Sequence, residues 1–357
     1  MTDGEYTMDM QKLETFMGRM VGELGSAINL PLMMIGDRVG LFAGLHGAGW
    51  LTPAQLGDKV GADERYVREW LSAMAAGQIV DYNPADETFQ LPEEHALALA
   101  VEGSPANLQG AFSVVGSTYF DWERMAQAFQ TGEGVGWHEH HHSLFNGTDR
   151  FFRPGYQAHL IDEWIPALEG VKDRLAVGGK VADVGCGFGS STILMAKAFP
   201  NSRFFGFDYH DASVEAARKA ADAAGVADRV SFDVASAKSF PGENYDFITV
   251  FDCLHDMGDP VGAARHIRKG LALDGTFMIV EPFAGDRLED NLNPVGRLFY
   301  AASTMVCTPG SRAQEVGACL GAQAGEARLR QVAIEAGFSR FRRAAQTPFN
   351  LVLEARP

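Results

Sequence analysis

The segment Val181–Gly189, which reads VADVGCGFG, constrains the fold of this chain more than any other. Its hydrophobic start ends in Asp183, and three glycines then alternate with other residues before a helical pattern begins at Ser190. Glycine lacks a Cβ atom and can adopt a positive φ, so the pattern predicts a buried strand, a tight turn and a helix start. Such a turn leaves room for a nucleotide-like ligand against the backbone, just beyond the carboxyl end of the strand.

The spacing of the glycines distinguishes between cofactors. A dinucleotide-binding loop, GxGxxG, has its third glycine or an alanine five residues after the first, and here that position is Ser190. Asp183 stands two residues before Gly185, where a carboxylate could accept a hydrogen bond from an ammonium group. The pattern D-x-G-x-G-x-G resembles the first motif of class I S-adenosylmethionine-dependent methyltransferases. The resemblance assigns five residues to cofactor binding: Asp183, Gly185, Cys186, Gly187 and Gly189.

Strand and helix patterns alternate after this loop. Arg203–Asp208 reads as a strand that ends in an acid about 20 residues beyond the loop, where nucleotide-binding folds place a ribose-binding carboxylate. Three further strand patterns follow with helical patterns between them: Val230–Val234, Tyr245–Phe251 and Gly275–Val280. This alternation predicts a parallel sheet with helices on both faces.

The last two strand patterns, Phe338–Ala344 and Phe349–Ala355, are too close together for a helical crossover. We therefore expect them to pair antiparallel through a turn that contains Pro348. This ending is similar to that of the seven-stranded methyltransferase sheet. The predicted fold class is α/β, with a Rossmann-like, cofactor-binding methyltransferase domain over residues 171–357.

The resemblance assigns further cofactor contacts to the ends of the predicted strands. Asp208 is the expected ribose ligand. Ser236 stands near the position where this family commonly has an Asp that binds the adenine amino group, and a hydroxyl can also accept a hydrogen bond. The other residues assigned to S-adenosylmethionine are Tyr209, Ala237, Asp252 and Cys253.

The first hundred residues predict a helical, dimer-forming region followed by a winged helix. Apolar residues recur at helical spacing within Met8–Leu45 and form a stripe that needs a partner. Thr52 and Gln55 form a capping box that begins a short helix, and Asp63 caps a second helix, Glu64–Ala76. A two-stranded wing is predicted within Ile79–Leu91. This order resembles bacterial, especially mycobacterial, methyltransferases with an N-terminal winged-helix domain and, more distantly, plant-type small-molecule O-methyltransferases.

A winged helix can bind DNA, or it can be a scaffold that covers an active site and forms a dimer. The charge of this region distinguishes between the two interpretations. Residues 1–100 contain fifteen Asp and Glu but six Lys and Arg, a net charge of −9, and the whole chain has a net charge of −16. A surface that follows DNA phosphates needs a net positive potential, so we expect no nucleic-acid partner. The alternatives are a transcriptional regulator that uses the cofactor fold as a sensor, and a catalytically silent subunit that serves assembly.

Acid–base candidates follow the fourth and fifth strands of the predicted sheet. His255 has an unperturbed pKa of about 6.5, which suits a general base, and Asp252 or Asp256 could orient it. The alternative is a histidine that only packs over the adenosine or caps the next helix. Glu281 is the second candidate, and its alternative is a structural acid bonded to backbone amides.

Residues 101–170 are predicted to form a helical linker and substrate lid. If its segment His138–His142 is extended, His138, His140 and His142 project to one side, where they could ligate zinc, copper or nickel. The alternative is a mobile lid whose histidines line a substrate pocket, next to the aromatic residues Phe151, Phe152 and Tyr156. Because methyl transfer requires no metal, we expect none.

The composition completes the prediction. The longest apolar stretch falls short of the ~20 residues that span a bilayer, and the N-terminus lacks a basic leader pattern. The four cysteines show no CxxC or framework spacing, which indicates free thiols in a reducing cytoplasm. We therefore expect a cytoplasmic, homodimeric S-adenosylmethionine-dependent methyltransferase that acts on a small-molecule acceptor without binding membranes. The acceptor atom stays open.

Overall fold

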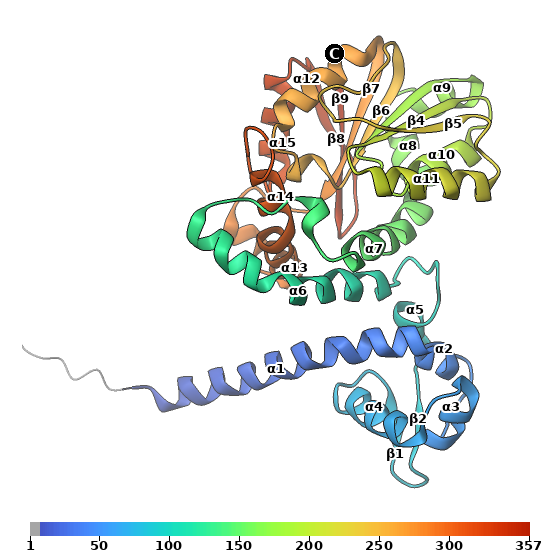
Figure 1. Cartoon of the computed structure of the whole chain (residues 1–357), viewed down its shortest axis with the longest axis vertical. Coiled ribbons are helices and arrows are strands. Elements are labelled where there is room, and N and C mark those ends of the chain that lie inside the picture. Colours follow the sequence, from blue (N-terminus) through green and yellow to red (C-terminus); the bar gives the residue numbers. More distant parts are fainter. Residues whose placement is uncertain (1–7) are drawn as a thin grey trace, which may run out of the picture. The chain divides into compact units, whose positions relative to one another are not determined.

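The structure, a computed structural model, describes residues 8–357 and divides into two compact units. The first unit extends to Gly116 and the second is Ser117–Pro357 (Figure 1). Helix α6, Gln109–Thr131, crosses the boundary, so the predicted linker of residues 101–170 contributes to both units. Between Met8 and Pro357, none of the helices combines the length and the hydropathy needed to cross a membrane.

The first unit contains the predicted helices and wing. Its elements are α1 (Met10–Val39), α2 (Leu41–Leu45), α3 (Pro53–Val60), α4 (Glu64–Ala76), β1 (Asp81–Asn83), β2 (Thr88–Gln90) and α5 (Glu93–Leu99). The capping box is confirmed, because the Thr52 hydroxyl accepts from the Gln55 amide and the Gln55 side chain accepts from the Thr52 amide. Asp63 caps α4 as predicted, and β1 pairs antiparallel with β2. The element order is that of a winged helix.

The core of the first unit forms where these helices meet the wing. Trp70 of α4 packs edge-on against Phe42 of α2, and its indole N–H donates to the carbonyl oxygen of Leu32. Leu56, Leu71 and Met74 are fully buried around them. The amino-terminal part of α1 contributes little to this core, and its apolar residues are exposed: Met10, Leu13, Phe16, Met17, Val21, Leu24 and Ile28.

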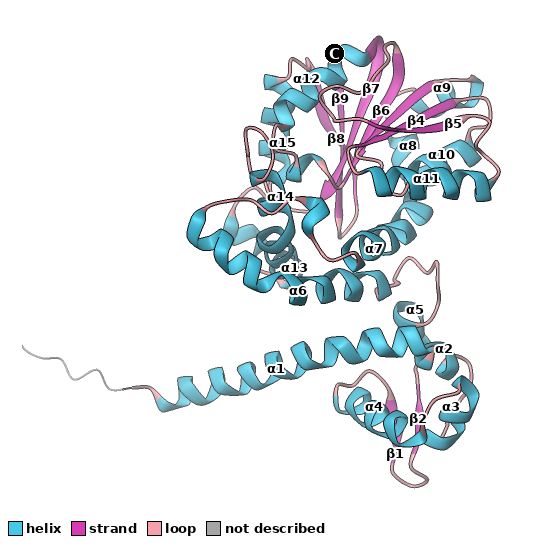
Figure 2. Cartoon of the chain, in the orientation of Figure 1, coloured by secondary structure: helices cyan, strands magenta, loops and turns pink. Residues whose placement is uncertain are grey.

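The second unit is built on a seven-stranded sheet in the order β5-β4-β3-β6-β7-β9-β8 (Figure 2). The strands are β3 (Lys180–Val184), β4 (Arg203–Asp208), β5 (Val230–Val234), β6 (Tyr245–Phe251), β7 (Leu271–Pro282), β8 (Arg340–Gln346) and β9 (Asn350–Arg356). The pairs from β5 to β7 are parallel, and β9 pairs antiparallel with β7 and with β8. This arrangement confirms the predicted parallel sheet and its carboxyl-terminal hairpin.

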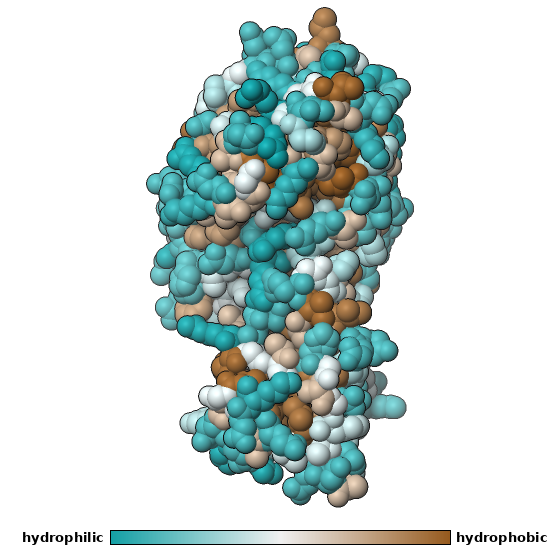
Figure 3. Space-filling view, turned by 90° about the vertical axis from the view of Figure 1, so that its right-hand side faces the viewer, coloured by the Kyte–Doolittle hydropathy of each residue, from teal (hydrophilic) through white to brown (hydrophobic). Residues whose placement is uncertain are grey.

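Helices cover both faces of the sheet. Helices α10 (Ser190–Ala198) and α11 (Asp211–Ala224) lie on one face, and α12 (Pro260–Gly270) and α15 (Gly325–Glu335) lie on the other (Figure 1). Neighbouring residues of β3 therefore enter different cores: Val181 packs with the first pair of helices and Ala182 with the second. Hydrophilic residues cover most of the molecular face in Figure 3, since much of the apolar surface lies inside these cores.

Shorter elements complete the second unit. They are η1 (Trp137–Glu139), α7 (Ser143–His159), η2 (Leu160–Trp164), α8 (Ile165–Ala167), α9 (Val171–Val177), η3 (Leu254–Asp256), η4 (Leu288–Asn291), α13 (Pro294–Ala302), η5 (Ser303–Cys307) and α14 (Thr308–Arg312). The strand order reverses between β3 and β6, because β4 and β5 continue on one side of β3 and β6 and β7 on the other. Loops diverge at such a point and leave a crevice for a ligand.

Candidate functional site

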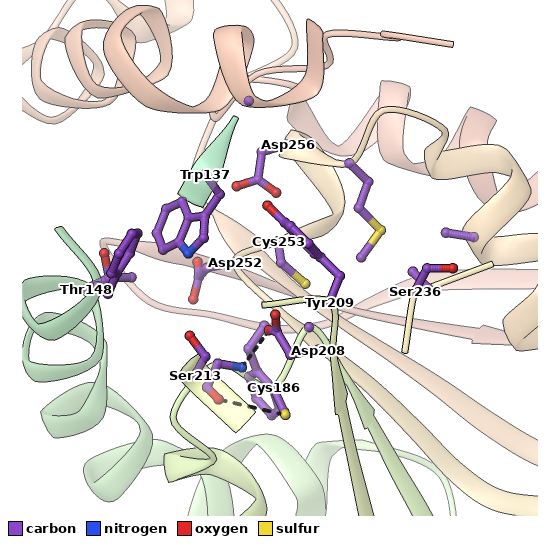
Figure 4. Close-up of a pocket in the computed structure, with 18 of the residues that line it drawn as sticks. Trp137, Thr148, Cys186, Asp208, Tyr209, Ser213, Ser236, Asp252, Cys253 and Asp256 are labelled. Carbon is purple, nitrogen blue, oxygen red and sulfur yellow. Dashed lines mark hydrogen bonds between the residues drawn. The ribbon is translucent and has the colours of Figure 1, made fainter. Parts of the chain in front are cut away.

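A cavity of about 540 Å³ opens at this reversal point, within the size range of small-molecule sites. Loops after β3, β4, β5 and β6 form its floor, and α7 and the η5–α14 segment contribute much of its wall. Figure 4 shows Trp137, Asp208, Tyr209, Asp252, Cys253 and Asp256 gathered around this space. All of its lining residues lie within the second unit.

The glycine turn after β3 has the backbone that the sequence predicts. Gly185, Gly187 and Gly189 have φ values of +75°, +51° and +78°. A Cβ atom on Gly185 would lie 2.6 Å from the Cys253 Sγ atom, and one on Gly189 would lie 2.5 Å from the Phe232 ring. Gly185, Cys186 and Gly187 line the cavity, whereas Gly189 lies behind the lining as the N-cap of α10. The turn thus exposes main chain to the cavity.

Asp183 is the buried anchor of this turn. Its side chain is fully buried and accepts hydrogen bonds from the hydroxyls of Ser191 (2.7 Å), Thr192 (2.6 Å) and Thr249 (3.0 Å). Burial raises the pKa of this carboxyl. Asp183 does not line the cavity, so in this structure it ties the first turn of α10 to β3 and β6 instead of facing a ligand's ammonium group.

Asp208 joins the end of β4 to the glycine turn. Its carboxylate accepts from the backbone amides of Gly187 and His210, each at 2.9 Å, and it lines the cavity. Burial raises the pKa of Asp208, and also that of its neighbour Tyr209. The remaining cofactor candidates from the sequence line the same cavity: Tyr209, Ser236, Ala237, Asp252 and Cys253.

Asp252 is held in a strained position at the end of β6. Its φ is +50°, which is uncommon for a residue with a side chain. The Tyr156 hydroxyl donates to its carboxylate at 2.9 Å, and the Asn350 amide donates at 3.1 Å. Burial, together with the negative charge of Glu281, raises the pKa of Asp252 to about 8. Tyr156 is 96 positions away in the chain, so no local sequence pattern indicates this contact.

His255 lies in a buried cluster behind the cavity. Its Nδ1 atom bonds to the Glu281 carboxylate, and its Nε2 atom lies 3.3 Å from the Cys307 Sγ atom. Burial favours the neutral imidazole, but the negative charge of Glu281 raises the pKa of His255 well above its usual value. The prediction that Asp252 or Asp256 orients His255 is therefore wrong, because the fold brings Glu281 of β7 against the imidazole ring of His255.

The three catalytic candidates divide into two roles by position. Asp256 lines the cavity, while His255 and Glu281 are buried and do not. Glu281 also accepts from the Leu254 backbone amide at 2.8 Å, the bond that the structural interpretation of this acid anticipated. Burial, with the charge of Glu281, raises the pKa of Asp256 to about 7.

The histidine segment does not adopt the extended form in which three imidazoles would share one side. Trp137–Glu139 is a 3-10 helix, so His138 turns with it. His140 is buried against the Asp121 carboxylate at 2.8 Å, and His141 bonds to the Ser143 hydroxyl. None of these histidines lines the cavity, and the expectation that they form its wall is wrong.

Aromatic residues from the same region do reach the cavity. Trp137 and, from α7, Phe145, Phe152 and Tyr156 line it. Asp149 of α7 accepts a hydrogen bond from the Ser190 hydroxyl at 2.6 Å, which connects this helix to the glycine turn. Sequence reasoning placed Phe152 and Tyr156 in a substrate lid but omitted Asp149, whose role depends on this contact across the fold.

Comparison with known proteins supports both units. Residues 26–101 match the family described as Rv2258c-like winged HTH domain, and residues 175–337 match the family described as methyltransferase domain. The 27-O-demethylrifamycin SV methyltransferase of Amycolatopsis mediterranei (strain S699) is 36% identical over 127 residues, which are 32% of this chain and 46% of that protein. The chain covers half or less of the length of the curated relatives it matches.

Solved structures of similar shape cover nearly the whole chain. The mitomycin 7-O-methyltransferase MmcR has a TM-score of 0.69 at 18% identity, with 98% of this chain and 100% of that chain covered. Human N-acetylserotonin methyltransferase, solved in complex with S-adenosylmethionine, has a TM-score of 0.67 at 17% identity, with 99% of each chain covered. These likenesses confirm the predicted methyltransferase fold with its N-terminal winged-helix domain.

Proposed function

The chain joins a winged helix-turn-helix domain to a class I methyltransferase domain, and we propose that it transfers a methyl group from S-adenosylmethionine to a small organic acceptor. One observation carries the proposal. Nine residues assigned to the cofactor from sequence alone line a single cavity at the reversal point of the sheet. Ligands bind at that point in open α/β sheets.

The residues present fit this cofactor. The exposed main chain of Gly185–Gly187 can lie against the nucleoside, because it lines the cavity and the space beside Gly187, where a Cβ atom would stand, is open. Asp208 has carboxylate lone pairs left for the ribose hydroxyls after its two amide bonds. We assign the adenine to Ser236 and Ala237, and the methionine portion to the side of Asp252 and Cys253. Asp183 and Gly189 contribute by holding the turn.

The chemistry needs placement and the removal of a proton. The sulfonium supplies an electrophilic methyl group, and the acceptor atom must approach it in line. For a hydroxyl or thiol acceptor, a proton must also leave. We propose that the cluster of His255, Asp256 and Glu281 activates the acceptor. Asp256 is the member that lines the cavity, and the buried, hydrogen-bonded pair of His255 and Glu281 adjoins it because His255 is the preceding residue.

A binding and turnover experiment tests the proposal. Calorimetric titration of the full chain with S-adenosylhomocysteine is expected to release heat with one site per chain. Incubation with S-adenosylmethionine and a panel of small hydroxyl, thiol and amine compounds is expected to yield S-adenosylhomocysteine. A well-folded chain that binds neither cofactor form contradicts the cofactor assignment. Binding without turnover, combined with a sequence-specific gel shift at physiological salt, favours the regulator instead.

We also propose that the chain forms a homodimer through α1. The exposed apolar residues of this helix recur every three or four positions from Met10 to Ile28, which is the spacing of a helix-packing stripe. A contiguous apolar stripe of this kind typically marks a protein interface. The acidic charge of residues 1–100 argues against DNA as the partner. The four free cysteines support a cytoplasmic location.

A further inference from the structure

Helix α7 turns one stripe of side chains toward the cavity, and this stripe contains an acid. Phe145, Asp149, Phe152 and Tyr156 follow one another at helical spacing, and all four line the cavity. Figure 4 shows Thr148, the residue before Asp149, among the side chains around the same space. The other three members of the stripe are aromatic, and the Asp149 side chain is only 15% exposed. A carboxylate in such surroundings loses hydration and needs partners.

Two of these partners belong to the protein and hold Asp149 beside the glycine turn. The Ser190 hydroxyl donates to one carboxylate oxygen at 2.6 Å, and the Arg153 guanidinium donates to the other at 2.7 Å. Ser190 begins α10 directly after Gly189, the last glycine of the turn. Each carboxylate oxygen can accept two hydrogen bonds, so each retains a lone pair for a ligand.

The stripe runs along the side of the cavity that we assign to the methionine portion of the cofactor. Two helical turns, about 10 Å, separate Asp149 from Tyr156, whose hydroxyl donates to Asp252 at the end of β6. The adenine is assigned to Ser236, after β5, on the opposite side of the sheet order β5-β4-β3-β6. Asp149 therefore lies at the amino acid end of the cofactor.

The acids of the cavity that lie on the nucleoside side have other partners. Asp208 accepts from two backbone amides and is assigned to the ribose. Asp259 and Glu315 both pair with Lys238, which follows Ala237 on the adenine side. These three carboxylates are thus committed away from the methionine portion.

Two acids on the methionine side are less suited to a permanent cation. Burial raises the pKa of Asp252 to about 8 and that of Asp256 to about 7, so a large share of each is protonated at neutral pH. Asp183, the acid of the sequence motif, lies behind the lining. Asp149 faces the cavity and forms an ion pair with Arg153.

We propose that Asp149 accepts a hydrogen bond from the ammonium group of the methionine portion of S-adenosylmethionine. The inference rests on the proposed function and gives Asp149 the contact that the sequence motif assigned to Asp183. The contact is a charge-assisted hydrogen bond, and no covalent bond changes. It places one cofactor contact on the helix that also carries the aromatic wall of the cavity, Phe145 and Phe152.

A pair of ligands that differ only at the ammonium group tests the contact without relying on turnover. The full chain is titrated in a calorimeter with S-adenosylhomocysteine and with its deaminated analogue, in which hydrogen replaces the ammonium group. The unmodified chain is expected to bind S-adenosylhomocysteine roughly 10- to 100-fold more tightly than the analogue. Asp149→Asn should remove this preference, because Kd rises for S-adenosylhomocysteine and changes less than about threefold for the analogue.

Three further variants separate the contact from other effects. Asp162→Asn is the matched control, because this exposed acid follows α7 in η2, does not line the cavity and should leave both Kd values unchanged. Asp208→Asn should weaken both ligands equally, since they share the ribose. Ser190→Ala removes one of the two groups that hold the Asp149 carboxylate and should reduce the preference in part.

The outcomes distinguish a ligand contact from a structural role. A carboxylate that only stabilises the N-terminus of α10 would make Asp149→Asn weaken both ligands equally, and this result refutes the contact. Equal affinities in the unmodified chain, or a preference retained in folded Asp149→Asn, also overturn it. Circular dichroism reports the folding of each variant, and Ser190→Ala decides the question if the asparagine variant does not fold. An unmodified chain that binds neither ligand contradicts the proposed function itself.

Discussion

Replacement of Asp208 gives the sharpest test of the cofactor site. Its carboxylate accepts hydrogen bonds from the backbone amides of Gly187 in the glycine turn and of His210, the N-cap of α11, each at 2.9 Å. If the same carboxylate accepts a ribose hydroxyl, Asp208→Ala removes one charge-assisted hydrogen bond. Such a bond is worth roughly 1.5–3 kcal/mol, which corresponds to an increase in Kd of about 10- to 150-fold.

The variant also has a stability cost that is separable from binding. Two backbone amides lose their acceptor, but Gly187 lines a cavity that water can enter and His210 is only partly buried. We therefore expect the free energy of unfolding to fall by only about 1–2 kcal/mol. Asp208→Asn retains one carbonyl oxygen and should lie between the alanine variant and the unmodified chain in both properties.

Calorimetric titration with S-adenosylhomocysteine measures the binding, and urea denaturation measures the stability. Asp233→Ala is the matched control, because this exposed acid lies on the neighbouring strand β5, pairs with Arg218 and does not line the cavity. A folded Asp208→Ala chain with unchanged Kd refutes the ribose assignment. An equal loss in Asp233→Ala would instead indicate a general effect of charge.

Three further predictions follow from the fold. At Gly185 the φ is positive and an added Cβ atom would lie 2.6 Å from the Cys253 Sγ atom, so Gly185→Ala should abolish S-adenosylhomocysteine binding in calorimetry. Gly225 has a similar φ but open space around an added Cβ atom, so Gly225→Ala should lower the free energy of unfolding by only about 1–2 kcal/mol. Equal effects of the two variants on binding would contradict this prediction. The pKa of Asp252 is about 8 in the folded chain and about 3.9 in the unfolded chain, so between these pH values the folded state binds one more proton than the unfolded state. The free energy of unfolding should therefore fall as the pH rises from 4 to 8, by at most about 1.4 kcal/mol per pH unit. Urea denaturation of Asp252→Asn should show a shallower slope over this window, and an unchanged slope would assign the effect elsewhere. Leu24→Lys places a charge on the exposed stripe of α1 and should shift the mass in light scattering from dimer to monomer; a monomeric unmodified chain would remove the dimer proposal.

Local patterns in the sequence predicted most of the fold because they depend on near neighbours. The strand patterns Arg203–Asp208, Val230–Val234 and Tyr245–Phe251 coincide with β4, β5 and β6. The capping box at Thr52 and the glycine turn after β3 likewise express hydrogen bonds and φ values set within a few residues. The cofactor candidates could be found for the same reason, since each stands at the end of a readable strand.

The partners of the buried polar groups could not be read from these patterns. His255 meets Glu281 and Cys307, which are 26 and 52 positions away, and Asp252 meets Tyr156 at a separation of 96. Asp183 was identified by its place in the motif, but the fold decided that its carboxylate faces three hydroxyls and not the cavity.

The amino-acid sequence by itself therefore determined the order of strands and helices, the glycine turn and the edge of the sheet where a ligand can bind. The tertiary structure alone decided which side chains meet there, which of them face the cavity and which lie buried behind it. The physical reason is that turns and periodic patterns arise between residues close in the chain. The environment of a carboxylate or an imidazole is instead set by groups that only packing brings within hydrogen-bonding distance.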